Sequence, residues 1–113
     1  MKIVDKKLTI GELKQMAADT FGDMVKAAID VDRELIAVDA ELHSDLEALL
    51  LEDGSKQKNI WGINLYPDMR GDGSIEFDSL INIRPSQGNR SRDVESEEIR
   101  KKIISVVAKS IVK

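Results

Sequence analysis

Hydrophobic positions recur with a helical period near the start of the chain and then change to a period of two. Thr9 and Glu12 match a capping box, and the apolar residues that follow predict a helix that ends near Gly22. Residues 24–42 instead alternate between apolar and polar positions, with a short polar break in the middle. This alternation predicts a β-hairpin over residues 24–42.

The segment 44–53 fits two structures. Ser44 and Glu47 could form a second capping box, Gly54 could end the helix, and Leu, Ala and Glu all favour helix. However, the neighbouring segments are predicted strands, and an antiparallel pair with residues 60–66 would be compact. We favour the strand, because tertiary context often overrides local propensity.

Three further elements follow from the pattern. Residues 60–66 alternate as a strand that Pro67 ends, and residues 75–84 alternate as a longer strand. Ser96 then begins a last helix, whose apolar stripe consists of Ile99, Ile103, Val106, Val107 and Ile111. Together these elements predict an α+β fold in a single domain, residues 1–113. It has a four- to five-stranded antiparallel meander, with the N-terminal and C-terminal helices packed on one face and a semi-polar face opposite.

Composition narrows the class of protein. The chain has 113 residues, of which 42% are hydrophobic and 34% are charged, as in an ordinary globular domain. No stretch is long and apolar enough for a membrane span, and the first residues do not resemble a secretory signal. Cysteine is absent, which excludes disulfides and thiolate sites and makes a cytoplasmic location the default. A net charge of −4 with few aromatic residues argues against a nucleic-acid partner.

The segment 82–92 concentrates polar chemistry. It carries three arginines, two asparagines and a glutamine but no acid, although the whole chain is acidic. Arginine side chains suit carboxylate and phosphate groups, so we predict an anion site, or a site for an acidic protein surface. Its residues would be Arg84, Gln87, Asn89, Arg90 and Arg92. In the alternative interpretation these arginines fasten the loop by pairing with acids of the chain itself: Asp45, Glu76, Asp78, Glu95 or Glu97.

A second candidate site contains the single histidine. If the hairpin's second strand continues, Glu41, His43 and Asp45 point the same way, about 6.6 Å apart per step, and could bind a divalent metal as cofactor. Asn64 projects from the polar side of its strand, and the arginine segment leaves the sheet on the face that would carry the histidine. Alternatively, His43 lies in a turn and hydrogen-bonds a backbone carbonyl.

Four stretches resemble a known family. "ELHSDLEALLLEDGSKQ", "IWGINLYP", "IEFDSLINIRP" and "QGNRS" cover most of residues 41–91. They resemble a small uncharacterised prokaryotic family, a domain of unknown function. The resemblance implies no activity and assigns no catalytic residues.

Two classes of function therefore stay open, and the sequence does not decide whether the protein is an enzyme. The first is a small binding or interaction module whose arginine segment receives an anionic small molecule or an acidic protein. The second is a small metal-dependent hydrolase acting on a phosphate- or carboxylate-bearing substrate. No membrane partner is expected. A homodimer could form through sheet edges or through an apolar patch at Leu49 and Leu51.

Overall fold

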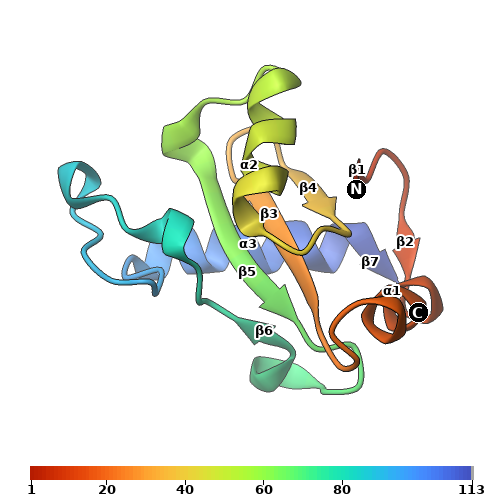
Figure 1. Ribbon diagram of the computed structural model, residues 1–113. Helices are drawn as coiled ribbons and strands as arrows, with labels where there is room; N and C mark the ends of the chain where they lie inside the picture. The colour runs from red at the N-terminus through yellow and green to blue at the C-terminus, as the bar shows by residue number, and fades with distance from the viewer. Residues whose placement is uncertain (113) are drawn as a thin grey trace.

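The computed structural model describes residues 1–112, apart from the side chain of Asp72, and it confirms the α+β class (Figure 1). The helices in this part of the chain are α1 (Ile10–Asp19), α2 (His43–Glu52) and α3 (Glu97–Ser110). The strands are β1 (Lys2–Ile3), β2 (Leu8–Thr9), β3 (Val25–Asp30), β4 (Leu35–Val38), β5 (Ile60–Leu65), β6 (Ile75–Glu76) and β7 (Ile111–Val112). Short 3₁₀ turns occupy Gln57–Asn59, Gly71–Ser74, Leu80–Asn82 and Pro85–Gln87.

The main sheet is antiparallel, with the strand order β1-β4-β3-β5-β6. The predicted hairpin is confirmed as β3 and β4, in which Ala28 lies opposite Ala37. The order differs from the predicted meander, because β5 returns to β3 and not to β4. Gly62 of β5 lies opposite Ala28 on the other side of β3. The long β3–β5 pairing therefore forms the centre of the sheet.

Hydrophobic residues on the two faces of the sheet form separate clusters. One cluster joins alternate residues of β3, β4 and β5 to Leu13 and Ala17 of α1 and to Ile103 and Val106 of α3. The other joins Leu46 and Leu50 of α2 to Ala28, Ala37 and Ile60. In Figure 1, α3 passes behind the strands and α2 lies in front of them. The face that we expected to be semi-polar is therefore partly covered by a helix.

The first and last helices begin where the sequence predicts. Thr9 caps α1, and its side chain and that of Glu12 form the reciprocal capping box. Ser96 caps α3, and its hydroxyl accepts a hydrogen bond from the backbone N–H of Ile99 at 3.3 Å. Both predictions held because a capping side chain acts within one turn and depends little on tertiary contacts.

The prediction of a strand for residues 44–53 is wrong, because this segment is helix α2. Leu46 and Leu50 lie one helical turn apart and are both fully buried. They pack on the small side chains of Ala28 and Ala37, so the helix can approach the sheet closely. Burial at a four-residue spacing therefore agrees with the helix propensity of Leu, Ala and Glu. The helix begins at His43, so Ser44 is not its cap.

The hairpin's second strand is shorter than we predicted. β4 ends at Val38, and the next residue, Asp39, has a φ of 73° in the left-handed region. This backbone conformation ends an extended strand. The segment 39–45 therefore contains no continuous strand that could align Glu41, His43 and Asp45.

The long strand predicted for residues 75–84 is also wrong. Pairing stops after Glu76, and the chain then makes 3₁₀ turns at Leu80–Asn82 and Pro85–Gln87. The hydroxyl of Ser79 accepts a hydrogen bond from the N–H of Ile81 at 3.3 Å, which favours the first turn. The apolar and polar residues do alternate in this segment. After Glu76, however, side-chain hydrogen bonds take the place of strand-to-strand backbone hydrogen bonds.

The two ends of the described chain meet in a second, parallel pair of strands. Leu8 lies opposite Ile111 and Thr9 opposite Val112, which joins β2 to β7 beside α1 (Figure 1). The sequence did not predict this pairing, because each strand has only two residues. None of the described helices is long and apolar enough to cross a membrane.

Candidate functional site

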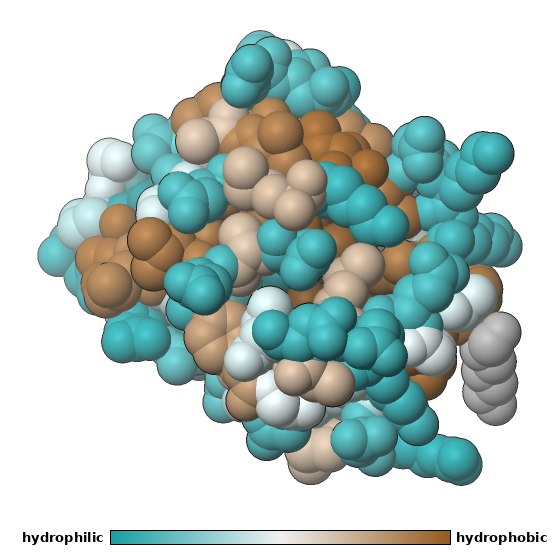
Figure 2. Space-filling view, turned by 45° about the vertical axis from the view of Figure 1, so that its right-hand side comes forward, coloured by the Kyte–Doolittle hydropathy of each residue, from teal (hydrophilic) through white to brown (hydrophobic). Residues whose placement is uncertain are grey.

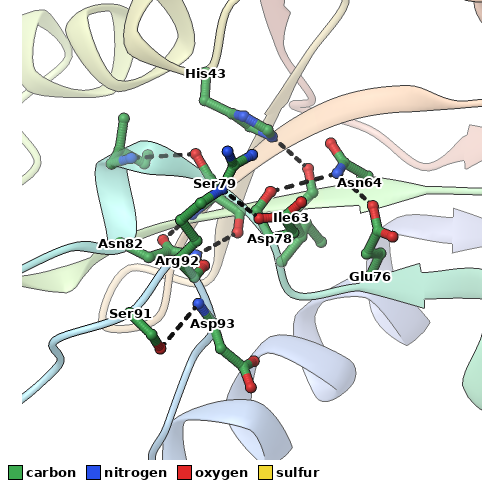
Figure 3. Close-up of polar contacts among 12 residues, drawn as sticks. His43, Ile63, Asn64, Glu76, Asp78, Ser79, Asn82, Ser91, Arg92 and Asp93 are labelled. Carbon is green, nitrogen blue, oxygen red and sulfur yellow. Dashed lines mark hydrogen bonds and ion pairs between the residues drawn. The ribbon is translucent and has the colours of Figure 1, made fainter.

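A cavity of about 400 Å³ opens where the start of α2 meets the end of β5 and the segment after β6. Figure 3 shows several of its polar residues, among them His43, Asn64 and Arg92, which come from segments far apart in the sequence. Its lining is Met24, Lys26, Leu42, His43, Ser44, Asn64, Glu76, Asp78, Ser79, Leu80, Ile81 and Arg92. The cavity thus brings His43, from the predicted metal site, together with Arg92, from the predicted anion site.

His43 is the first residue of α2 and is half-buried. Its Nε2 lies 2.8 Å from the backbone oxygen of Ile63, as one of our two interpretations of this residue expected. Burial lowers the pKa of the imidazole below its ordinary value of 6.5, and the positive charge of Lys26 lowers it further. The Ile63 carbonyl, the negative charge of Asp78 and the Asn64 side chain oppose this shift. The net result is a ring that is neutral near pH 7.

Asn64 lies beside His43 and is only 5% exposed. Its Nδ2 donates to a carboxylate oxygen of Glu76 at 2.8 Å and to the backbone oxygen of Asp78 at 3.4 Å. These two bonds orient the amide, whereas its Oδ1 is buried and has no hydrogen-bond partner. A buried acceptor without a donor is energetically unfavourable. Asn64 Oδ1 therefore remains a hydrogen-bond acceptor that lacks a donor.

Two cationic side chains line the cavity. Arg92 donates from Nε to Asp78 at 2.6 Å, and this ion pair is about half exposed. Lys26 of β3 lies 5.1 Å from the centroid of the Phe21 ring. Among the residues that the structure describes, Lys26 forms no ion pair with a carboxylate. Its charge therefore remains available to an anion.

The start of α2 lines the same cavity. Leu42 occupies the N-cap position and has no side-chain oxygen that could accept from the first turn. Leu42, His43 and Ser44 all line the cavity. The first N–H groups of a helix have no partner within the helix, and they carry the positive end of its dipole. The cavity therefore lies beside the N-terminus of α2 and has two cationic side chains in its lining.

Arg84, the first residue of the predicted anion site, is buried elsewhere. It is 8% exposed, its guanidinium lies 4.9 Å from the centroid of the Trp61 ring, and Nε donates to the oxygen of Ile81. Nη2 contacts the backbone oxygen of Ile60 and lies 3.4 Å from Glu47. Burial lowers the pKa of Arg84, and the charge of Glu47 opposes this effect. Arg84 fastens β5 to the turns that follow β6.

The loop after Arg84 is closed by its own hydrogen bonds. Asn89 is 4% exposed, and its Nδ2 donates to the backbone oxygens of Asn82, Ser91 and Asp93. The backbone N–H groups of Arg90 and Ser91 donate to the Glu95 carboxylate. The Ser91 hydroxyl, whose effect is the largest, and these two N–H groups lower the pKa of Glu95 below its ordinary value. These bonds give those polar groups of Asn89, Arg90 and Ser91 partners within the loop, without an external ligand.

The remaining residues of the predicted anion site lie apart from the cavity. The side chain of Gln87 donates to the backbone oxygen of Lys58, and Arg90 is exposed to solvent. Arg92 alone among the five residues of the predicted anion site lines the cavity. Most of the arginine segment is thus a structural clasp.

The geometry expected for a metal site at Glu41, His43 and Asp45 is not observed. His43 and Asp45 both lie in the first turn of α2, where residues two apart point in different directions. Across the described residues, no three or more His, Asp or Glu side chains gather in a way that could hold a metal ion.

Two residues of the cavity were absent from the predicted sites. Lys26 lay within the alternating segment 24–42 and was not singled out, and Asn64 was noted only as a polar position of its own strand. Pairing of their two strands would have revealed both residues together, because Lys26 and Asn64 lie opposite each other across β3 and β5. That register was not predicted, because the sequence suggested that β5 pairs with the segment before it.

Hydrophobic side chains also reach the surface. Leu42 and Leu80 line the cavity and are 55% and 68% exposed, so its mouth is partly apolar. Figure 2 shows hydrophobic side chains gathered in the upper part of one face, at the level of α2 in Figure 1, with hydrophilic side chains around them. Leu51 of α2 is 41% exposed, whereas Leu49 is half-buried. The homodimer remains a prediction.

The fold and the cavity define a small α+β protein with a charge-lined recess beside its single histidine. Comparison with known proteins places it further. The chain belongs to the family described as "Protein of unknown function (DUF5674)", whose model matches residues 2–110. This confirms the resemblance to a family without an assigned activity. No curated protein and no solved structure matches the chain.

Proposed function

We propose that this protein is a small binding module, and that the cavity beside His43 receives the anionic group of a small molecule. The observation that carries this proposal is the presence of Lys26 and Arg92 in the lining of one cavity with the uncapped start of α2. Helix N–H groups and cations together form a common arrangement for phosphate and carboxylate. This proposal retains the ligand class that the arginine segment suggested but moves its site. A cytoplasmic location remains part of the proposal, supported by composition alone.

Lys26 contributes most to this proposal. Arg92 is already paired with Asp78, so part of its charge is compensated within the protein. Lys26 instead has an aromatic ring as its neighbour, and an ammonium over a ring keeps its charge uncompensated. An anion in the cavity would gain the full attraction of Lys26 and a smaller one from Arg92.

The test is the melting temperature of the protein with added phosphate, at an ionic strength held constant with sodium chloride. A ligand that binds only the folded state raises the melting temperature, and the rise grows with the logarithm of the ligand concentration relative to Kd. We expect millimolar phosphate to stabilise the wild type, and we expect Lys26→Gln to reduce this effect by about fivefold or more in apparent affinity.

Lys102→Gln provides the matched control. Lys102 lies on α3 and forms only an exposed pair with Glu98, so it loses the same charge without touching the cavity. An equal loss of phosphate protection in both variants would show a general charge effect and contradict the proposal. No protection of the wild type at all would contradict it as well.

A further inference from the structure

The hydrogen bond between His43 and Ile63 determines which nitrogen of the ring carries the proton. Nε2 lies 2.8 Å from a backbone carbonyl oxygen, which can only accept. Nε2 must therefore donate, and it carries the hydrogen in the neutral ring. The lone pair of the neutral imidazole is then on Nδ1.

Nδ1 is reachable from the cavity. His43 is half-buried and lines the cavity, and within the described residues its ring makes a hydrogen bond only through Nε2. The buried polar side-chain atoms that lack a partner include Asn64 Oδ1 but not His43 Nδ1, so Nδ1 is not sealed inside the protein. The cavity thus presents an accessible acceptor of known tautomer.

Asn64 reinforces this arrangement. Its Nδ2 is held by Glu76 and Asp78, so the amide cannot rotate to offer a donor to the histidine. Figure 3 shows Asn64 on the same side of the site as the bond from His43 to Ile63. The Asn64 side chain raises the pKa of His43, because its proximity to the ring favours the protonated form. The Ile63 oxygen therefore places the hydrogen on Nε2 and leaves Nδ1 as the acceptor.

Resting on the proposed anion site, we infer that the ligand carries a hydrogen-bond donor, a hydroxyl or an ammonium, close to its anionic group, and that His43 Nδ1 accepts from it. The lining of the cavity offers cations for the anionic group and a neutral acceptor for the donor. An anion without a donor would remove Nδ1 from water and give it no partner. Such an unpaired polar atom weakens binding by about tenfold or more.

The experiment compares phosphate monoesters that carry a donor with similar ones that lack it. Glycerol 3-phosphate is paired with propyl phosphate, and phosphoethanolamine with ethyl phosphate. Dissociation constants are measured by calorimetry at pH 8 and constant ionic strength, with inorganic phosphate as a reference. We expect at least one donor-bearing ligand to bind the wild type about tenfold more tightly than its donor-free partner. A larger difference within the glycerol 3-phosphate pair indicates a hydroxyl donor, and a larger difference within the phosphoethanolamine pair indicates an ammonium.

His43→Gln is the matched variant. A glutamine amide can still donate to the Ile63 oxygen, but it has no acceptor at the position of Nδ1. We expect the variant to bind both members of each pair equally, near the affinity of the donor-free ligand for the wild type. Equal binding of both members by the wild type would overturn the inference, and so would full discrimination by the variant.

A pH series on the wild type gives a second readout that needs no variant. Protonation converts Nδ1 from an acceptor to a donor, so the preference for donor-bearing ligands should disappear as the pH falls below the range in which the ring is neutral. The charged groups around the ring are Lys26 of β3, Glu76 of β6, Asp78 after it, and Arg92. A preference that persists at pH 4.5 would contradict the role of His43.

If inorganic phosphate and all four ligands fail to bind, the anion site itself is wrong. If donor-free ligands bind as well as the others, the anion site stands and only this inference fails.

Discussion

The side-chain amide of Asn82 pairs with both backbone groups of Gly62. Gly62 donates to Oδ1 at 2.8 Å, and Nδ2 donates to the Gly62 oxygen at 2.9 Å. Two such bonds are what a neighbouring antiparallel strand would supply at this position of β5. A single side chain therefore covers an edge that would otherwise be open, and Asn82 is fully buried.

Replacement of Asn82 should test this role. Asn82→Ala leaves the N–H and C=O of Gly62 without partners, and it also removes a bond to the oxygen of Arg92. We expect a loss of about 3 kcal/mol in the free energy of unfolding, measured with urea. Gln87→Ala is the control, because Gln87 is an exposed amide with one bond to the backbone of Lys58. Its loss should stay below about 1 kcal/mol, and equal losses would contradict the role of Asn82.

Arg84 and Arg90 should differ sharply, although both belong to the arginine segment. Arg84→Ala leaves the Glu47 carboxylate, which is 15% exposed, without its cation and removes the donor to Ile60. We expect about 3 kcal/mol of destabilisation. Arg90→Ala removes an exposed side chain and should change stability by less than about 0.5 kcal/mol. Chemical unfolding of both variants measures the two losses of stability. A larger loss for Arg90→Ala than for Arg84→Ala would mean that the clasp has been assigned to the wrong arginine.

The last helix offers a comparison between neighbouring residues. Ile103 is fully buried in the core shared with α1 and the sheet, whereas Ile104 is 47% exposed. Ile103→Ala should lower the free energy of unfolding by about 3 kcal/mol, since it removes methyl groups from a packed site. Ile104→Ala should cost less than about 1 kcal/mol. Similar thermal melts for the two variants would show that α3 is not docked as described.

The pKa of His43 should appear in the dependence of stability on pH. Burial lowers this pKa in the folded state below 6.5, so the unfolded chain binds the proton first as the pH falls. Stability should be complete above about pH 6.5 and should decrease from there down to the folded-state pKa. His43→Gln should show no decrease in that window. Urea unfolding between pH 8 and pH 5 measures the effect, and parallel curves for the two proteins would exclude His43 as its source.

The sequence predicted the elements that depend on local chemistry. The caps at Thr9 and Ser96 and the alternation of β3 and β4 are visible within a few residues, and all were confirmed. The errors concern side chains that act at a distance. Nothing near Asn82 in the sequence shows that its amide will meet Gly62, twenty residues earlier.

The site was predicted in part for the same reason. His43 and Arg92 were both identified as chemically important, and the structure brings them to one cavity. Lys26 and Asn64 joined them only through the pairing of β3 with β5. That pairing follows from α2 being a helix, since a helix between β4 and β5 lets the chain cross to the far side of β3. One ambiguous segment therefore determined both the strand order and the composition of the site.

The pairing of β2 with β7 has a consequence for how the chain folds. The contact between Leu8 and Ile111 closes a loop of roughly a hundred residues, and closure of a long loop is entropically unfavourable until its interior is ordered. The β3–β4 hairpin and α3 involve contacts that are much nearer in sequence and can form first. The parallel pair should then form after the folding transition state, so that weakening it accelerates unfolding while hardly changing the folding rate.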